Sequence, residues 1–307
     1  MSDGRILVLT GGVGGAKLVL GLQQVVAPER IVAVVNTGDD FDHLGLRVSP
    51  DIDTLLYTLS GLADREKGWG RGDETWSFMA ALKAIGGEDW FLLGDRDLAL
   101  HVERTRRLAA GQSLSQVTAA FAASLGVAPT ILPMSDDPIT TRVVTDAGVL
   151  DFQDYFVRRR CAPRLESVRF DGAEAARPAP GVLEALQDPD LAAILIAPSN
   201  PWLSVDPILS VPGLRDALRS AAAPVVAITP LPGGRAVKGP TAKIMAELGV
   251  ELTAASIERH YAGVVDRWLL DAADAPVASP HAFCDTLMQT LDDRARVARA
   301  ALDLAGR

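Results

Sequence analysis

The feature of the sequence that most constrains the fold is a glycine-rich turn near the N-terminus, set between an apolar run and a helical pattern. Residues 6–9 predict a buried strand, and apolar side chains recur at helical spacing over residues 16–22. The glycines of the turn are Gly11, Gly12, Gly14 and Gly15. A strand, a glycine turn and a helix in this order expose backbone N–H groups at the positive end of the helix dipole, and glycine lets an anion come close. We expect a phosphate-binding loop here; the alternative is a tight turn without a ligand.

The spacing of this turn matches neither of two common phosphate-binding motifs. A dinucleotide-binding fingerprint that starts at Gly12 would need glycine or alanine at the position of Lys17. A Walker A loop would need a Gly-Lys-Ser/Thr sequence, whereas Lys17 follows Ala16 and precedes Leu18. We therefore interpret the turn as a phosphate cradle of another kind.

A cluster of acidic residues is predicted at the same edge of the sheet. A second buried strand at residues 30–36 runs into the polar segment 36–40, and residues 49–54 signal the start of a helix at Pro50. The acidic side chains of these segments are Asp39, Asp40, Asp51 and Asp53. Clustered carboxylates repel one another unless a cation or substrate donors neutralise them, and oxygen ligands beside a phosphate cradle favour Mg²⁺. For Asp51, a pure capping role is an equal alternative.

Composition excludes several classes of function. The chain has 307 residues and a net charge of −9, which gives no electrostatic footprint for nucleic acid or an anionic membrane. The two cysteines lie far apart and lack metal-ligand spacing. The N-terminus has no signal-peptide layout, and every apolar run is shorter than the roughly 20 residues that span a bilayer. We expect a cytoplasmic protein.

The order of predicted elements favours an α/β fold with a mainly parallel central sheet. Further strand-like runs lie at residues 191–196, 224–231 and 264–270, and the first of them delivers Ser199 and Asn200 to the edge where ligands bind. We expect residues 1–60 and 181–307 to form this core, with a closing helix over residues 282–305. Residues 61–180 are predicted to form a smaller inserted subdomain richer in helix.

The predicted insertion carries two further candidate features. In the turn Gly94-Asp95-Arg96, the guanidinium of Arg96 could pair with a phosphate and Asp95 with a polar group. The basic patch at residues 158–160 is either a solvated face or a contact for a phosphate tail. We find no Ser-His-Asp or Cys-His arrangement, so a glycine cradle, acidic residues and loop cations together indicate a nucleotide-dependent transferase.

Six segments in register resemble the 2-phospho-L-lactate transferase family of coenzyme F420 biosynthesis. They are residues 11–17, 36–40, 49–54, 94–97, 133–137 and 197–201. The resemblance covers nearly the whole chain. It implies a Rossmann-like three-layer sandwich and a homodimer.

The resemblance also implies a Mg²⁺-dependent phosphotransferase. The terminal ribityl hydroxyl of the deazaflavin Fo would attack the β-phosphate of a guanosine diphosphate that carries a three-carbon acid, and GMP would leave. The acid could be phospholactate, phosphoenolpyruvate or 3-phosphoglycerate, and the sequence does not decide among them. The alternative is a nucleotide-sugar-binding regulator of a related family that shares the glycine-rich first loop.

The family pattern assigns expected roles to individual residues. Catalytic roles fall to Asp53, Asp40 and Arg96, with Asp53 a candidate to accept the hydroxyl proton. Metal ligands would be Asp39, Asp40 and Asp53. Substrate-binding residues would be Gly11, Gly12, Gly14, Gly15, Lys17, Asn36, Thr37, Asp51, Asp53, Leu92, Gly94, Asp95, Ser199, Asn200 and Pro201.

Overall fold

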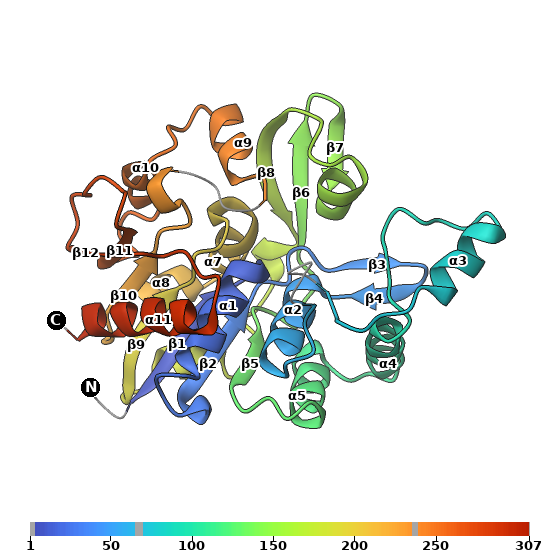
Figure 1. Cartoon of the computed structure of the whole chain (residues 1–307), viewed down its shortest axis with the longest axis horizontal. Coiled ribbons are helices and arrows are strands. Elements are labelled where there is room, and N and C mark those ends of the chain that lie inside the picture. The colour runs from blue at the N-terminus through green and yellow to red at the C-terminus, as the bar shows by residue number, and fades with distance from the viewer. Residues whose placement is uncertain (1–3, 65–69, 235–238, 307) are drawn as a thin grey trace.

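A parallel sheet of seven strands forms the centre of the molecule (Figure 1). The computed structural model describes residues 4–64, 70–234 and 239–306. The strands lie in the order β12-β11-β10-β9-β1-β2-β5. Their bounds are β1 (Arg5–Thr10), β2 (Ile31–Val35), β5 (Thr130–Pro133), β9 (Leu191–Ile196), β10 (Val225–Ile228), β11 (Arg267–Asp271) and β12 (His281–Cys284). The α/β class and the parallel sheet expected from the sequence are confirmed.

The inner strands β1, β2 and β10 are buried on both faces, which is why they are apolar over most of their length rather than alternating. Along β1, Leu7 and Leu9 join one hydrophobic cluster, whereas Ile6 and Val8 join the other. Val8 pairs with Ala33 of β2 and with Leu195 of β9, which places β1 in the middle of the sheet. The turn that follows β1 therefore lies at the centre of the sheet's carboxyl edge.

Helices cover each face of the sheet and complete three layers. One layer consists of α1 (Gly12–Leu22), α2 (Pro50–Leu59), α5 (Leu114–Ser124) and α11 (Leu291–Ala305), which pack through residues such as Leu18, Ile52 and Val297. The other layer contains η4 (Pro201–Val205), α6 (Val182–Leu186), α7 (Asp206–Ser210), α8 (Leu214–Ser220), α9 (Thr241–Glu247) and α10 (Ala254–His260). Short helical turns η1 (Pro28–Arg30), η3 (Ala173–Ala175) and η5 (Pro232–Gly234) connect elements.

Two smaller units extend from this core (Figure 1). One is an antiparallel sheet, β7-β6-β8, made of β6 (Thr140–Thr145), β7 (Gly148–Asp151) and β8 (Leu165–Asp171), with the π-helical turn η2 (Asp154–Arg158) beside it. The other is an arm built from the hairpin β3 (Phe41–His43) and β4 (Leu46–Val48) with α3 (Ser77–Ala84) and α4 (Asp97–Ala109).

The sequence-based prediction fails over part of the closing helix. Residues 281–284 form β12, which pairs in parallel with β11, and α11 begins only at Leu291. The physical reason is the cap: Thr290 accepts from the N–H of Asp293, whose side chain accepts from the N–H of Thr290 in return. Apolar residues upstream of this cap join the edge of the sheet.

The boundaries drawn from composition run across the central sheet. Both β5 and α5 lie within residues 61–180, yet β5 pairs with β2 and α5 packs in the helix layer beside α2. The division of the chain into a core and an insertion stays a prediction. Within the described residues, no helix is long and apolar enough to cross a membrane.

Candidate active site

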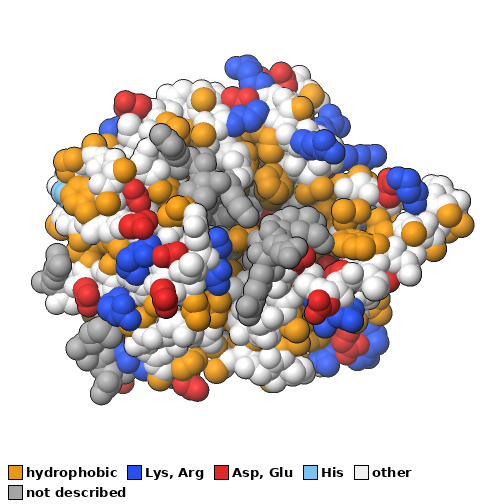
Figure 2. Space-filling view, viewed as in Figure 1, with side chains coloured by type: hydrophobic (Ala, Val, Ile, Leu, Met, Phe, Trp, Pro, Cys, Tyr) orange, Lys and Arg blue, Asp and Glu red, His pale blue; other side chains and the backbone are white. Residues whose placement is uncertain are grey.

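A cleft of about 870 Å³ opens at the carboxyl ends of the parallel strands. Its walls come from the segments that follow β1, β2, β9, β10 and β12, and from α2, α4 and η2. Ligands of parallel α/β sheets bind at this edge because the loops that leave neighbouring strands diverge there. On the face shown in Figure 2, hydrophobic side chains gather between the antiparallel sheet and the arm. We take this cleft as the candidate active site.

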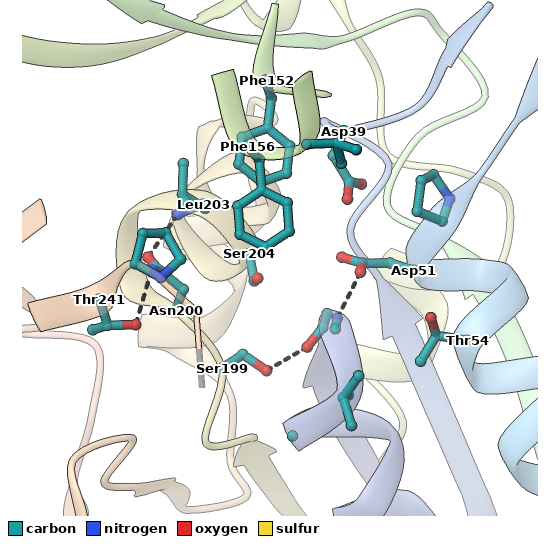
Figure 3. Close-up of a pocket in the computed structure, with 18 of the residues that line it drawn as sticks. Asp39, Asp51, Thr54, Phe152, Phe156, Ser199, Asn200, Leu203, Ser204 and Thr241 are labelled. Atoms are coloured by element: carbon teal, nitrogen blue, oxygen red, sulfur yellow. Dashed lines mark hydrogen bonds between the residues drawn. The ribbon is translucent and has the colours of Figure 1, made fainter. Parts of the chain in front are cut away.

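The glycine turn brings the N-terminus of α1 against two other segments. The carboxylate of Asp51 accepts a hydrogen bond of 2.7 Å from the backbone N–H of Gly12 (Figure 3). A Cβ atom on Gly11 would lie 2.6 Å from the other oxygen of Asp51, and a Cβ on Gly14 would lie 2.6 Å from the carbonyl oxygen of Pro198. Gly12 has a φ of +64°, a conformation that favours glycine. The glycines are needed because backbone and carboxylate come this close.

Not every residue of the turn faces the cleft. Gly11, Gly12, Gly14 and Lys17 line it. Gly15 packs instead against β1 and the segment after β9, where a Cβ would collide with the hydroxyl of Thr10. The ammonium of Lys17 donates to the carbonyl of Met288 at 2.9 Å, which ties α1 to the segment after β12. The structure thus gives Gly15 a packing role and leaves the other residues of the turn at the cleft surface.

The segment after β9 both lines the cleft and organises it. Ser199 donates to the carbonyl of Gly11 at 2.7 Å (Figure 3). The side-chain oxygen of Asn200 accepts from the N–H groups of Trp202 and Leu203, and its amide donates to Thr241 at 3.0 Å. Asn200 is therefore the cap of η4 and also fastens the start of α9. Pro201 is buried behind Asn200 and does not line the cleft.

The predicted acidic cluster forms, and burial raises the pKa of three of its carboxyl groups. Burial, followed by the charges of Asp51 and Asp40, raises the pKa of Asp39 well above its usual value. Burial raises the pKa of Asp51 to about 6 and that of Asp40 to about 7. Asn36 donates to Asp39 at 3.2 Å and to Asp51 at 2.9 Å, which links the two carboxylates.

The members of this cluster differ in what they face. Asp39 and Asp51 line the cleft (Figure 3). Asp40 lies outside the cleft lining and accepts from Ser49 at 2.6 Å. Asn36 and Thr37 are buried behind the cleft and do not line it. The structure therefore presents Asp39 and Asp51 to a ligand and places the other residues in support.

Asp53 lines the cleft, and its carboxylate is hydrogen-bonded by a residue that does not line the cleft. Both of its carboxylate oxygens accept from the guanidinium of Arg104, which is 1% exposed. His101 lies 3.7 Å from the same carboxylate and also lines the cleft. Sequence analysis missed Arg104 and His101 because α4 carries several charged residues and nothing in the pattern separates the buried ones from the solvated ones.

The described residues contain no group of three or more His, Cys, Asp or Glu side chains arranged to hold a metal ion. Asp40 and Asp53 are occupied by Ser49 and Arg104, so Asp39, Asp40 and Asp53 do not form a preassembled ligand set. Asp39 and Asp51 line the cleft and have no ion-pair partner in the part of the chain that the structure describes, and the oxygens of Asp51 accept hydrogen bonds from Gly12 and Asn36. Mg²⁺ is commonly held by one or two carboxylates together with substrate phosphates. The pair therefore fits such a site, and magnesium binding stays a prediction.

An aromatic wall closes the end of the cleft opposite the glycine turn. The rings of Phe152 and Phe156 stack with centroids 5.3 Å apart and an angle of 15° between their planes. Trp90 and Phe91 line the same end, and the guanidinium of Arg158 lies 5.7 Å from the Trp90 ring centroid. Aromatic faces of this kind bind planar rings by stacking. Sequence analysis did not identify Phe152 and Phe156 as candidate site residues, because no local pattern separates a ring-binding wall from ordinary packing.

The turn at residues 94–96 supports the arm and does not line the cleft. Asp95 accepts from the N–H groups of Ser77 and Phe78 at 3.0 Å each, so it caps α3. The backbone N–H of Arg96 donates to Glu74, and Gly94 packs against the same glutamate. Leu92, just before this turn, does line the cleft and is 50% exposed.

The three arginines of the basic patch, residues 158–160, differ in what they contact. Arg158 and Arg159 form ion pairs with Asp154. Arg160 lines the cleft, where Lys17 is the other cationic residue among the described lining residues. Arg160 has a φ of +50°, a conformation uncommon outside glycine.

Comparisons with known proteins agree over nearly the full chain. The family model described as 2-phospho-L-lactate transferase CofD matches residues 6–300. A phosphoenolpyruvate transferase from Kitasatospora aureofaciens is 45% identical over 315 residues, covering 98% of this chain and 98% of the relative. A phosphoenolpyruvate transferase from Mycobacterium tuberculosis is 40% identical over 335 residues, covering 98% and 99%.

The fold also has a counterpart among solved structures. A member of the UPF0052 family from Bacillus halodurans superposes with a TM-score of 0.64 at 18% identity, covering 98% of this chain and 100% of that one. At this level of identity the match supports the architecture alone.

Proposed function

Because the chain belongs to the 2-phospho-L-lactate transferase CofD family and is a transferase of F420 biosynthesis, we propose that it transfers a phosphoenolpyruvate group to the deazaflavin Fo. The family membership confirms the resemblance seen in the six sequence segments. The donor would be a guanosine diphosphate esterified with enolpyruvate on its β-phosphate. The alternative of a nucleotide-sugar-binding regulator has only the shared fold in its support.

The proposed reaction is a single phosphoryl-group displacement. The oxygen of the terminal ribityl hydroxyl bonds to the β-phosphorus, and the bond between that phosphorus and the bridging oxygen of the diphosphate breaks. GMP leaves with the electron pair of the broken bond, and the hydroxyl proton passes to a base or to solvent. Positioning and charge neutralisation contribute most of the rate in such transfers.

The choice of enolpyruvate rests on the relatives. Proteins that are 40% to 45% identical over essentially the whole chain carry the name phosphoenolpyruvate transferase. Phospholactate and 3-phosphoglycerate were equal alternatives from the sequence, and the family description itself mentions phospholactate. The close relatives favour enolpyruvate.

The two ends of the cleft suit the two substrates. The observation that carries the proposal is that one cleft joins a glycine turn at a helix N-terminus to a wall of aromatic rings. We place the guanosine diphosphate near α1, Lys17 and Ser199, where N–H groups and a cation face an anion. We place the deazaflavin ring against Phe152 and Phe156, and the reacting atoms between these ends.

Acidic residues lie between the two ends. Asp39 and Asp51 would hold Mg²⁺ together with the diphosphate oxygens of the donor. The bound ion would neutralise charge on those oxygens. Asp53 would accept a hydrogen bond from the attacking hydroxyl and orient it, since a carboxylate retains free lone pairs when it accepts two bonds from an arginine. Arg160 is the candidate contact for the carboxylate of the transferred acid.

A transferase assay tests the proposal. Purified protein is incubated with Fo, Mg²⁺ and the enolpyruvyl adduct, and the products are identified by mass spectrometry. The expected products are GMP and a phosphodiester of Fo. An Asp53→Asn variant that remains folded and keeps the full transfer rate would remove Asp53 from its proposed role.

A further inference from the structure

We propose that Arg104 is a positioning residue of the transfer reaction, which acts by fixing the carboxylate of Asp53 in the wall of the cleft. The inference rests on the proposed function, in which Asp53 orients the attacking hydroxyl. Arg104 does not itself line the cleft, so it would act only through the residue in front of it. Neither composition nor the family pattern quoted above singles out this arginine.

The contact between the two side chains is bidentate and buried. Nη1 of Arg104 donates to Oδ2 of Asp53 at 3.1 Å, and Nη2 donates to Oδ1. Arg104 is 1% exposed and Asp53 is 5% exposed. Two parallel hydrogen bonds fix the plane of a carboxylate as well as its position, which a single bond does not. The direction in which Asp53 meets the cleft is therefore set by the guanidinium.

The guanidinium is itself held in place by a neighbour on its own helix and by groups on β4 and α5. Nη1 lies 3.3 Å from the carbonyl oxygen of Arg47 in β4. It also lies 3.3 Å from Nδ1 of His101. The ring of Phe121 packs against the guanidinium, with its centroid 5.8 Å away.

The chain of contacts continues back to the cleft surface. Nε2 of His101 lies 3.2 Å from Oδ2 of Asp97, and Asp97 accepts from the hydroxyl of Tyr57 at 2.5 Å. Asp53, Tyr57, Asp97 and His101 all line the cleft, whereas Arg104 stands behind them. Arg104 is thus the buried centre of a polar network, four members of which line the cleft.

A role limited to fold stability accounts poorly for this arrangement. A buried ion pair contributes little net stability compared with apolar residues of the same volume, because two charges must leave water. A buried ion pair is useful despite this cost when one partner must present oriented oxygens to a substrate. Misplacement of a reacting group by about 1 Å can lower a rate roughly 100-fold, so a fixed carboxylate has a direct kinetic value.

The experiment compares Arg104→Lys, Arg104→Met, Asp53→Asn and the double variant Asp53→Asn/Arg104→Met. Lysine keeps the charge but cannot form the two parallel bonds. We expect Arg104→Lys to lower kcat by about 10- to 100-fold, with the KM of the guanosine donor nearly unchanged. In otherwise wild-type protein, Arg104→Met should lower kcat to a similar extent. In protein that already carries Asp53→Asn, Arg104→Met should cause no further loss.

Binding and folding are measured on the same variants. Fo binding is followed by its fluorescence, and we expect Asp53→Asn and Arg104→Lys each to weaken it, again without an added loss in the double variant. The double variant should melt at a higher temperature than Arg104→Met, because it leaves no buried carboxylate without a partner. Arg107→Lys is the matched control: Arg107 lies on the same helix and packs on the same ring of Phe121, with a centroid distance of 5.6 Å, but does not contact Asp53.

The outcomes separate this inference from the proposed function. Wild-type protein that binds Fo but yields no transfer product would overturn the proposed function, while the binding comparison would still test Arg104. Equal losses from Arg104→Met in both backgrounds, or a wild-type rate and Fo affinity for Arg104→Lys, would overturn the positioning role. A loss for Arg107→Lys as large as that for Arg104→Lys would also contradict it.

Discussion

The carboxylate of Asp51 in α2 accepts a hydrogen bond from the backbone N–H of Gly12 at 2.7 Å and so occupies the N-terminus of α1. An acidic side chain therefore sits where a helix dipole would attract an anion. Its second oxygen accepts from Asn36 at 2.9 Å. The glycine turn thus binds a carboxylate of the protein itself, and a donor phosphate would contact the remaining surface of the turn.

Asp51→Asn should destabilise the protein. The amide oxygen can still accept from Gly12, but its nitrogen then faces the amide nitrogen of Asn36. Asn36 cannot rotate to compensate without losing its bond to the N–H of Gly38. One buried donor is left without a partner, which costs about 1–3 kcal/mol. Urea unfolding measures this loss, and Asp303→Asn on the exposed side of α11 is the control that should be nearly neutral.

The pH dependence of stability should reveal the buried Asp40. Burial raises its pKa from 3.8 to about 7, so the folded state holds a proton that the unfolded state releases. The free energy of unfolding then falls as pH rises from about 4 to 7 and levels off above that, with a contribution of up to a few kcal/mol.

Asp40→Asn removes this contribution, together with the ion pair of 3.8 Å between Oδ2 of Asp40 and Nη2 of Arg47. An amide oxygen can still accept from Ser49, and Oδ1 of Asp40 has no hydrogen-bond partner to lose. We expect the variant to be more stable than the wild type at pH 8 and the difference to shrink toward pH 4. Urea titrations at several pH values measure the difference in the free energy of unfolding between the two proteins. A difference that grows toward low pH would contradict the prediction.

Gly14→Ala should damage both the fold and nucleotide binding. The new Cβ would lie 2.6 Å from the carbonyl oxygen of Pro198, so the segment after β9 must move away from α1. Overpacking of this kind costs about 1–3 kcal/mol. The matched control is Gly72→Ala, whose Cβ would have its nearest neighbour at 3.5 Å. Thermal melting and GMP titration should separate the two variants; equal behaviour would contradict the close contact.

Phe156→Leu should weaken the binding of the acceptor Fo and leave the binding of the guanosine donor unchanged. Phe156 lies in the cleft and stacks on Phe152, and the loss of one stacking ring costs about 1–3 kcal/mol in comparable ring-binding sites. The KM for Fo should therefore rise several-fold or more, with the KM of the guanosine donor unchanged. Phe283→Leu at the exposed edge strand β12 is the control. A change in the KM of the guanosine donor alone would contradict the assignment of this end of the cleft to the deazaflavin ring.

The central sheet could be predicted because most of its strands are buried on both faces. Continuous apolar runs such as Ile6–Leu9 allow few other structures, and a parallel order brings their carboxyl ends to one edge. The strand β12 could not be predicted in the same way, because it has only four residues and only partial burial. Its place in the sheet depends on pairing with β11, which is a contact distant in the chain.

The site was predictable where backbone chemistry defines it and not where tertiary packing does. Glycines and acidic residues at strand ends follow from local rules, and the cluster around Asp39 and Asp51 does form. Arg104 and Phe156 come from elements whose inward face is decided by packing alone. The turn at Asp95 shows the reverse error: a polar sequence at a plausible position serves as the cap of α3.

The most direct test of the account is a competition assay in which Fo, Mg²⁺ and guanosine-diphospho adducts of enolpyruvate, lactate and glycerate are offered together. Mass spectrometry identifies the Fo phosphodiester, and GMP release is measured in parallel. We expect a product that contains enolpyruvate, formed with one GMP per phosphodiester. Preference for another acid would contradict the proposed donor, and a folded protein that binds Fo or nucleotide but forms no phosphodiester would contradict the proposed reaction.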